Sequence, residues 1–180
     1  YLTPELLRGN SSFIEHCPEV GSVPVRNGEL IVLWDGSNAG EILKAKAGAL
    51  ASTMAKINIQ SLEIDPPYLY FYLKSNESRI KNLVRGSGIP HVDRKVFSEL
   101  PSEFPDNLVE QRKIAKILED VDEAIEQTKS LIRKYQRIKQ GLIQDLMTKG
   151  VDEFGNLRPP HELAPNLYQE TLLGFIPAVW

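Results

Sequence analysis

The chain has 180 residues, of which 42% are hydrophobic and 25% are charged, and its formal net charge is −3. This length and composition argue against a disordered chain and predict one globular domain, or one globular domain with an appended element. The single cysteine, Cys17, excludes an internal disulfide and a cysteine-based zinc site, so we expect a reducing, cytoplasmic setting. The sequence has neither an apolar run long enough to span a membrane nor the pattern of a signal peptide, so we expect no membrane partner.

The fold class predicted for this chain is α+β, because short strand and helix patterns fill residues 1–106. Apolar and β-branched residues at 28–34 predict a buried strand, which the turn-rich segment 35–40 closes. Alternation over 54–59 predicts a half-exposed strand, and residues 67–81 predict a helix. We therefore expect a small globular domain of mixed α/β structure.

A long helix is predicted for residues 107–150. Asn107, with Glu110 three positions later, has the form of a capping box, and Lys149 followed by Gly150 is a typical helix end. Such a helix has about 41 residues and is roughly 60 Å long. Its apolar residues recur with heptad-like spacing, and the domain before it cannot bury them all, so we expect a partner helix. The predicted pairing residues are Ile114, Leu118, Val121, Ile125, Ile132, Tyr135 and Leu142.

The charge of this helix is divided into two blocks. Residues 119–126 include five acidic residues and no basic one, and residues 129–139 include five basic residues and no acidic one. Two parallel copies would place like charges side by side, whereas an antiparallel pair places acid beside base. We therefore predict that the helix pairs antiparallel with another helix, from a second copy or from a related segment. A solvated helix face is the plainer explanation for either block taken alone.

Residues 74–95 are the predicted nucleic-acid contact. This segment has six basic and two acidic residues, a net charge of +4 within an acidic chain. Lys and Arg suit contacts to phosphates, and Arg, Ser and His suit contacts to base edges. An ordinary solvated surface has a similar composition, so the segment alone does not decide the matter. The predicted contact residues are Lys74, Arg79, Lys81, Arg85, Ser87, His91, Arg94 and Lys95, with Lys74 and Lys81 on phosphates.

No catalytic, metal or phosphate-loop site is predicted. Asp35, Ser37 and His91 are the residue types of a hydrolase triad, but the sequence lacks a G-x-S-x-G elbow. The three histidines are isolated and lack the spacing of metal ligands. Residues 86–88, Gly-Ser-Gly, are not followed by the Lys-Ser/Thr of a phosphate loop.

Two stretches of the predicted helix carry a family resemblance. They are residues 108–122, LVEQRKIAKILEDVD, and residues 139–151, KQGLIQDLMTKGV. Both closely resemble the conserved helix of the specificity subunits of type I restriction-modification enzymes. Upstream, NGELIV at 27–32 with Asp35-Gly36, and GSGIPH at 86–91, are similar to the target recognition domain of that family.

The resemblance implies a non-catalytic subunit that recognises a DNA sequence. In that family two recognition domains, each reading one half of a bipartite target, are held apart by two conserved antiparallel helices. The implied partners are double-stranded DNA, modification (methyltransferase) subunits and, through the complex, restriction subunits, in a bacterial or archaeal cytoplasm. S-adenosylmethionine, ATP and Mg²⁺ would be bound by those partner subunits, and this chain would need no cofactor.

The resemblance also implies a domain organisation. Residues 1–106 would be a target recognition domain that lacks its beginning, 107–150 the conserved coiled-coil spacer helix, and 151–180 a linker into the next recognition domain. GFIPAVW at 174–180 resembles the start of such a domain, so we expect a fragment, or a half-subunit that forms a homodimer through its long helix. Two alternatives are a structural coiled-coil protein without base-specific DNA binding and the recognition domain of a fused single-chain restriction-methylation enzyme. An enzyme acting alone ranks third.

Overall fold

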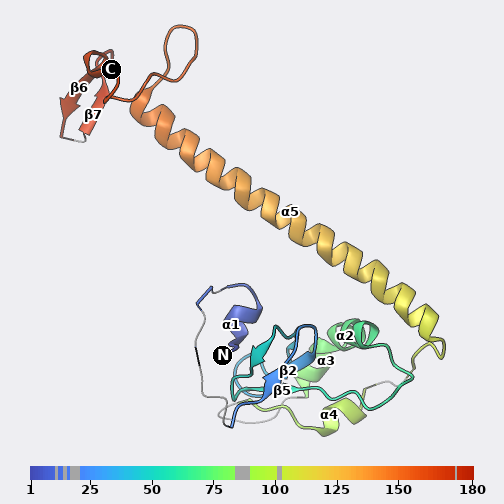
Figure 1. Cartoon of the computed structure of the whole chain (residues 1–180). Coiled ribbons are helices and arrows are strands. Elements are labelled where there is room, and N and C mark those ends of the chain that lie inside the picture. Colours follow the sequence, from blue (N-terminus) through green and yellow to red (C-terminus); the bar gives the residue numbers. More distant parts are fainter. Residues whose placement is uncertain (11, 14–15, 17–20, 84–89, 101–102, 173) are drawn as a thin grey trace. The chain divides into compact units, whose positions relative to one another are not determined.

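The structure is a computed structural model that describes residues 1–10, 12–13, 16, 21–83, 90–100, 103–172 and 174–180. Cys17 lies outside these ranges. The chain divides into two compact units, Tyr1–Asp120 and Val121–Trp180. Short strands, short helices and one long helix, α5 (Leu108–Lys149), make up the described residues, so the predicted α+β class is confirmed (Figure 1).

The first unit is built on a three-stranded antiparallel sheet with the order β3-β2-β5. Its strands are β2 (Leu30–Leu33), β3 (Ile42–Lys44) and β5 (Met54–Lys56). The central strand β2 lies inside the buried strand predicted at 28–34, and all four of its residues are buried. The strand predicted at 54–59 is also present, but it is limited to the three residues of β5.

Successive side chains of β2 serve two different cores, because neighbouring residues of a strand point to opposite faces of the sheet. Ile31 and Leu33 belong to one cluster, and Leu30 and Val32 belong to the other. The first cluster also contains Leu2, Val25, Ala45, Leu50, Ala51 and Met54. The second also contains Ala39, Ile42, Leu73, Ile80, Val92 and Val96. A strand buried on both faces explains why residues 30–33 read as a continuous apolar run rather than an alternating one.

The remaining short elements of this unit complete the two cores. The two-residue strands β1 (Pro24–Val25) and β4 (Gly48–Ala49) pair antiparallel. The short helix α1 (Pro4–Leu7) packs Leu6 and Leu7 against the first core, and the short helix α4 (Lys95–Ser98) contributes Val96 to the second. Leu2 pairs with Leu50 in an isolated parallel bridge, so the first residues of the chain contribute to the first core.

The single helix predicted at 67–81 is wrong, because two helices occupy this region. They are α2 (Pro66–Ser75) and α3 (Glu77–Asn82), and Asn76 lies between them. Asn76 leaves the helical backbone conformation, with φ −96° and ψ 4°, and its side-chain Nδ2 donates to the Tyr72 carbonyl at 2.9 Å. An Asn side chain that competes for backbone partners in this way favours a helix end over a helix interior.

The long helix α5 confirms the element predicted for 107–150. Asn107 Oδ1 accepts a hydrogen bond from the Val109 N–H at 2.8 Å, as an N-cap residue does. After the last helical residue, Gly150 adopts φ +65°, and its N–H donates to the Leu146 carbonyl at 3.0 Å. Figure 1 shows α5 as one uninterrupted helix. Among the described residues, no helix has both the length and the apolar character that a membrane span requires.

The first turns of α5 are fixed to the first unit by a buried amide. Gln111 is only 1% exposed. Its Oε1 accepts from the Asp65 N–H at 2.8 Å, and its Nε2 donates to the carbonyls of Glu63 at 2.9 Å and Pro105 at 2.8 Å. Arg112 Nε adds a bond to the Asp65 carboxylate at 3.1 Å. The start of α5 is therefore held by the loops before α2 and before α5 itself.

The segment predicted as a linker, 151–180, contains regular structure. After the 3-10 turn η1 (Pro165–Leu167), the strands β6 (Tyr168–Thr171) and β7 (Gly174–Pro177) form an antiparallel hairpin. His161 stacks on Phe175 with 3.7 Å between ring centroids. The prediction missed this hairpin because each strand has only four residues of mixed polarity, too few for a periodic pattern.

Gly150 joins the end of α5 to this segment. The Arg158 N–H donates to the Gly150 carbonyl at 3.3 Å, and Arg158 Nη1 donates to the Lys149 carbonyl at 3.3 Å. A Cβ atom at position 150 would lie 2.5 Å from Arg158 Nη1 and 3.1 Å from Trp180 Cζ2. The positive φ therefore favours glycine here, and a Cβ atom would displace the guanidinium end of Arg158 and crowd Trp180.

Candidate functional site

Two of the predicted basic residues share one carboxylate. Lys74 Nζ lies 2.6 Å from Glu77 Oε2, and Lys81 Nζ lies 2.6 Å from Glu77 Oε1. The Ile42 N–H also donates to Glu77 Oε2, at 3.2 Å. This Glu77 cluster, made of Lys74, Glu77 and Lys81, places two ammonium groups at the junction of α2 and α3 with a net charge of +1.

The pKa of Glu77 reflects this cluster. Burial of the carboxyl group acts to raise the pKa, because it penalises the charged form. The hydrogen bonds from Lys74, Lys81 and the Ile42 N–H favour the charged form and outweigh burial, so the pKa of Glu77 is lowered. The carboxylate is therefore ionised at neutral pH and offsets part of the positive charge that the sequence indicated.

Two other predicted contact residues, Arg79 and Lys95, form hydrogen bonds outside the Glu77 cluster. Arg79 Nη2 donates to the Glu99 carbonyl at 3.3 Å, which ties α3 to the end of α4. Lys95 begins α4, and its backbone N–H donates to the Asp93 carboxylate at 3.0 Å. Arg85 and Ser87 lie outside the described residues, so their predicted role stays a prediction.

His91 forms a cluster with the end of strand β2. Its Nδ1 lies 2.5 Å from Asp35 Oδ1, and its ring packs edge-on to Trp34 with 5.3 Å between centroids. Backbone pairing supports this contact, because Asp35 and His91 form an antiparallel bridge and the Val92 N–H donates to the Trp34 carbonyl at 3.0 Å. The structure thus brings together residues that are 56 positions apart in the sequence.

Arg94 completes this group from the segment after His91. Its guanidinium carbon lies 5.9 Å from the centroid of the Trp34 ring, which is within the range of a cation–π contact. Trp34, His91 and Arg94, with Val92 and Asp93, line an open surface pocket of about 540 Å³. We call Trp34, Asp35, His91 and Arg94 the Trp34 cluster. It combines an aromatic face, an imidazole and a guanidinium at one exposed site, which are groups that contact nucleic-acid bases and phosphates.

One turn connects the Trp34 cluster with the Glu77 cluster. Residues 35–40 begin at Asp35, which holds His91, and end at Gly40. A Cβ atom at Gly40 would lie 3.1 Å from Lys81 Cγ and 3.2 Å from the Lys81 backbone nitrogen, and Gly40 has φ +91°. The close approach and the positive φ both favour glycine. The two clusters therefore occupy the two ends of a six-residue turn that the sequence analysis identified only as a strand connection.

Two members of the Trp34 cluster were missed as contact residues. The sequence predicts Trp34 only as part of the buried strand, and it presents Asp35 as a hydrolase residue type and, with Gly36, as part of the family resemblance. The sequence signal was an aromatic residue at the last position of an apolar run, directly before the Asp35-Gly36 turn. Strand ends carry side chains out of a core, so such an aromatic is a reasonable contact candidate.

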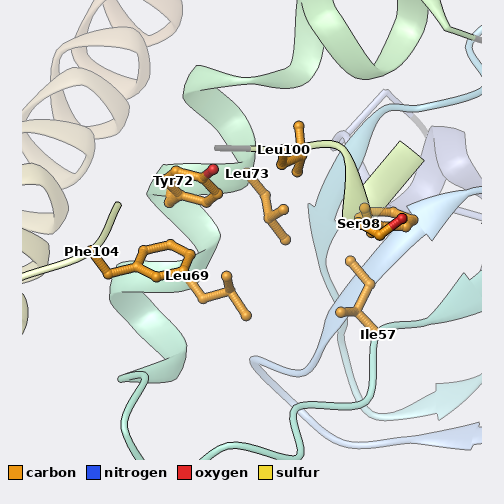
Figure 2. A pocket seen from close by; sticks show the side chains of 8 residues that line it. Ile57, Leu69, Tyr72, Leu73, Ser98, Leu100 and Phe104 are labelled. Carbon is orange, nitrogen blue, oxygen red and sulfur yellow. The ribbon is translucent and has the colours of Figure 1, made fainter. Parts of the chain in front are cut away.

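An apolar pocket of about 360 Å³ lies elsewhere in the first unit. Figure 2 shows Leu69, Tyr72 and Leu73 on α2, with Phe104 beside Tyr72 and with Ser98 and Ile57 across from the helix. Phe97 and Leu100 complete the lining. Burial raises the pKa of the Tyr72 hydroxyl, which keeps that group neutral. The pocket therefore offers no charged group to a phosphate.

The predicted pairing face of α5 is largely exposed in the single chain. Six of its seven predicted residues are more than a third exposed, and the seventh, Ile114, is partly buried. The six are Leu118 at 38%, Val121 at 52%, Ile125 at 45%, Ile132 at 51%, Tyr135 at 61% and Leu142 at 53%. The contacts of α5 with the rest of the first unit use Gln111, Ala115 and Glu119, which lie on the helix beside Ile114 and Leu118 rather than opposite them.

The described residues hold no group of three or more His, Cys, Asp or Glu side chains placed to bind a metal ion. His91 and Asp35 form a pair without a third such ligand in this part of the chain. The groups that the Trp34 cluster offers to a ligand are therefore polar and aromatic side chains.

Comparisons with known proteins identify a family that this chain resembles. Residues 1–134 match the family model described as "Type I restriction modification DNA specificity domain". The chain is 37% identical, over its full length and 40% of the relative, to the type I restriction enzyme MjaVIII specificity subunit of Methanocaldococcus jannaschii. It is 30% identical to a protein of Mycoplasma pneumoniae named as a type I specificity subunit, over 58% of this chain and 28% of that protein.

A solved structure shows the same fold over much of the chain. It is the S subunit of a type I restriction-modification system from M. genitalium, with a TM-score of 0.59 and 28% sequence identity. The match covers 67% of this chain and 33% of that structure. The chain thus spans less than half the length of the curated relatives and of the solved structure that it matches.

Proposed function

The chain belongs to the family of type I restriction-modification DNA specificity domains, and from this premise we propose that its first unit reads one half of a bipartite DNA target. The observation that supports this proposal most directly is the Trp34 cluster, joined through residues 35–40 to the Glu77 cluster. One cluster offers side chains suited to base edges, and the other offers ammonium groups suited to phosphates.

In this proposal the two clusters have different tasks. Lys74 and Lys81 contact phosphates and fix the position of the unit on the duplex, while His91 and Arg94 contact base edges. Arg79, Arg85, Ser87 and Lys95 are further contact residues around them. The carboxylate of Glu77 limits how strongly the lysines attract DNA in general, which favours recognition by sequence over recognition by charge.

We propose that α5 pairs antiparallel with another helix through its exposed apolar face. Its exposed residues repeat at heptad-like intervals, and such a face in water favours association. The acidic block at 119–126 would then lie beside the basic block at 129–139 of the partner helix. Such a pair would hold two recognition domains at a fixed separation.

The remaining roles belong to the whole protein. We propose that the subunit is non-catalytic, that it assembles with modification and restriction subunits in the cytoplasm of a prokaryote, and that S-adenosylmethionine, ATP and Mg²⁺ bind to those partners. The match of residues 1–134 to a DNA specificity domain disfavours a purely structural coiled-coil protein, because it covers the globular unit as well as the helix.

Adenine methylation across a genome tests this function. The intact parent subunit, expressed with its modification subunit, is expected to produce one bipartite methylation motif. A subunit in which residues 85–95 are replaced is expected to produce a motif changed in one half only. The absence of any motif with the unchanged subunit would refute DNA recognition, and two unchanged halves with the replaced subunit would refute the placement of base contacts in this segment.

A further inference from the structure

Asp35 and His91 are held in one fixed arrangement at an exposed site. The side chain of His91 is 52% exposed and that of Asp35 is 34% exposed. Their backbones are bridged, and the Gly36 N–H donates to the Pro90 carbonyl at 3.0 Å. Val92, the next residue after His91, is fully buried in the second core. The imidazole therefore stands on a backbone that the core fixes, although the ring itself meets solvent.

The bond between these side chains determines which ring nitrogen is left for a ligand. An ionised carboxylate only accepts hydrogen bonds, so Nδ1 of His91 must carry the hydrogen that Asp35 Oδ1 receives. In the neutral ring the other nitrogen, Nε2, then has a free lone pair and is a hydrogen-bond acceptor. The edge-on contact with Trp34 holds the ring plane as well.

A hydrogen-bond acceptor at Nε2 of His91 can bind only those groups of DNA that donate a hydrogen bond. In the major groove the only hydrogen-bond donors on base edges are the exocyclic amino groups of adenine and cytosine. Phosphate oxygens only accept, so they offer nothing to a neutral Nε2. Arg94, against Trp34, supplies donors for an acceptor on an adjacent base or for a phosphate.

We propose that Asp35 is a specificity-determining positioning residue, which holds His91 so that Nε2 accepts a hydrogen bond from an exocyclic amino group of one base in the major groove. This inference rests on the proposed DNA-recognition function and adds a residue and a chemical group to it. An acidic side chain beside DNA repels phosphates, so Asp35 lowers general affinity while it raises discrimination at one position.

Asp35→Asn tests the positioning role with little change in shape. Asn has the same size, but its amide can donate to Nδ1 of His91, so it no longer fixes the tautomer that leaves Nε2 as an acceptor. Asp106→Asn is the matched control, because it makes the same Asp-to-Asn change at an exposed residue of the first unit that lies outside the Trp34 cluster.

The measurements use the intact parent subunit in complex with its modification subunit. Methylation motifs are determined first, and binding is then measured on duplexes that match the motif or differ at one position. We expect Asp35→Asn to reduce discrimination at one position by about 5- to 150-fold, the usual range for one base contact. Asp106→Asn should leave discrimination unchanged, and each variant should strengthen binding to unrelated DNA, because each removes one negative charge.

His91→Ala separates positioning from a general structural effect. If Asp35 acts through His91, Asp35→Asn changes discrimination no further in the His91→Ala background. Duplexes that carry a base analogue without the exocyclic amino group at the affected position provide the chemical test. They should weaken binding of the unchanged complex and leave binding of the Asp35→Asn complex the same.

Each outcome has a distinct meaning. An unchanged motif with full discrimination for Asp35→Asn overturns the positioning role while DNA recognition stands. Equal loss with Asp106→Asn, or insensitivity of the unchanged complex to the missing amino group, also overturns it. If the unchanged subunit yields no motif, the proposed function fails and this inference fails with it.

Discussion

Gln111 shows how much a single buried side chain does at the start of α5. Both ends of its amide are engaged, by one N–H and two carbonyls from three separate residues. Truncation would leave these three backbone groups without their partner, and the Asp65 N–H, whose bond to Gln111 is buried, would lose more than the net value of that bond.

We expect Gln111→Ala to lower the free energy of unfolding of the first unit by about 2–4 kcal/mol. Hydrogen exchange of the β2 amide protons measures this, because β2 lies at the centre of both cores. Gln127→Ala is the control on the same helix, since Gln127 is exposed and its Nε2 bonds only Glu123, one turn away. Equal effects of the two substitutions would contradict the anchoring role.

Glu77 makes the stability of the first unit dependent on pH. Its pKa is lower in the folded chain than its ordinary value, so the unfolded chain binds the proton more readily and acid favours unfolding. The contribution is complete at neutral pH and is lost in acid, as the pH falls below the ordinary pKa of glutamate and through the lowered pKa of the folded chain.

Glu77→Gln is therefore expected to destabilise the chain at pH 7 and to matter less at pH 3. Urea denaturation of the unchanged chain and the variant at both pH values gives the two differences. A destabilisation of the same size at both pH values would show that the ionised carboxylate is not what stabilises this cluster.

At the scale of the element, α5 presents an apolar face without a described partner. Side chains two positions apart on a helix point about 200° apart, so Ile132 and Ser130 lie on opposite sides of α5. Ile132 is 51% exposed, and Ser130 is exposed too. Substitution of either residue by Glu adds the same charge in the same block, which separates the effect of the face from the effect of charge.

We expect Ile132→Glu to raise the dissociation constant of helix pairing by about 10- to 100-fold, because one buried aliphatic side chain is replaced by a charge. Ser130→Glu should change it far less. Sedimentation equilibrium of the purified chain measures self-association for both variants. Similar dissociation constants for the two would place the pairing face elsewhere on α5.

The elements differ in how far the sequence could predict them. α5 was predictable because periodicity and both end signals extend over 42 residues, and β2 because it is a continuous apolar run. The break at Asn76 depends on one side-chain bond, and the hairpin of β6 and β7 depends on eight residues of mixed polarity.

At the candidate site, the sequence allowed the basic residues to be selected by their residue type. Their partners Glu77 and Asp35 could not be selected in this way. His91, for example, meets Asp35 only because two backbone segments that are distant in the sequence pair with each other.

At the scale of the whole molecule, the net charge is small although single segments are strongly charged. The net charge is only −3, yet α5 alone contains an acidic block followed by a basic block. Antiparallel pairing makes the two blocks attract, so added salt should weaken association by screening. Parallel pairing would give the opposite dependence, because salt would then relieve repulsion between like blocks.

Charge reversal gives a sharper test of this arrangement. If the five acidic residues at 119–126 are replaced by Lys, we expect self-association to fall, because basic blocks then oppose each other. If the five basic residues at 129–139 are also replaced by Glu, we expect association to recover. Association of these chains is again measured by sedimentation equilibrium, and failure of the double reversal to restore it would contradict antiparallel pairing.

The cramped glycine at position 150 has a consequence for mutational tolerance. A side chain there would adopt an unfavourable φ and displace the end of Arg158, so a saturation scan should prefer glycine, with Asn tolerated best among the others, whether or not the chain has a partner. Gln111 should be similarly restricted at the other end of α5. Between these two positions, the predicted pairing face should tolerate polar residues when the scan selects for folding and reject them when it selects for helix pairing. The contrast between the two scans would trace, residue by residue, the surface that the proposed partner helix would cover.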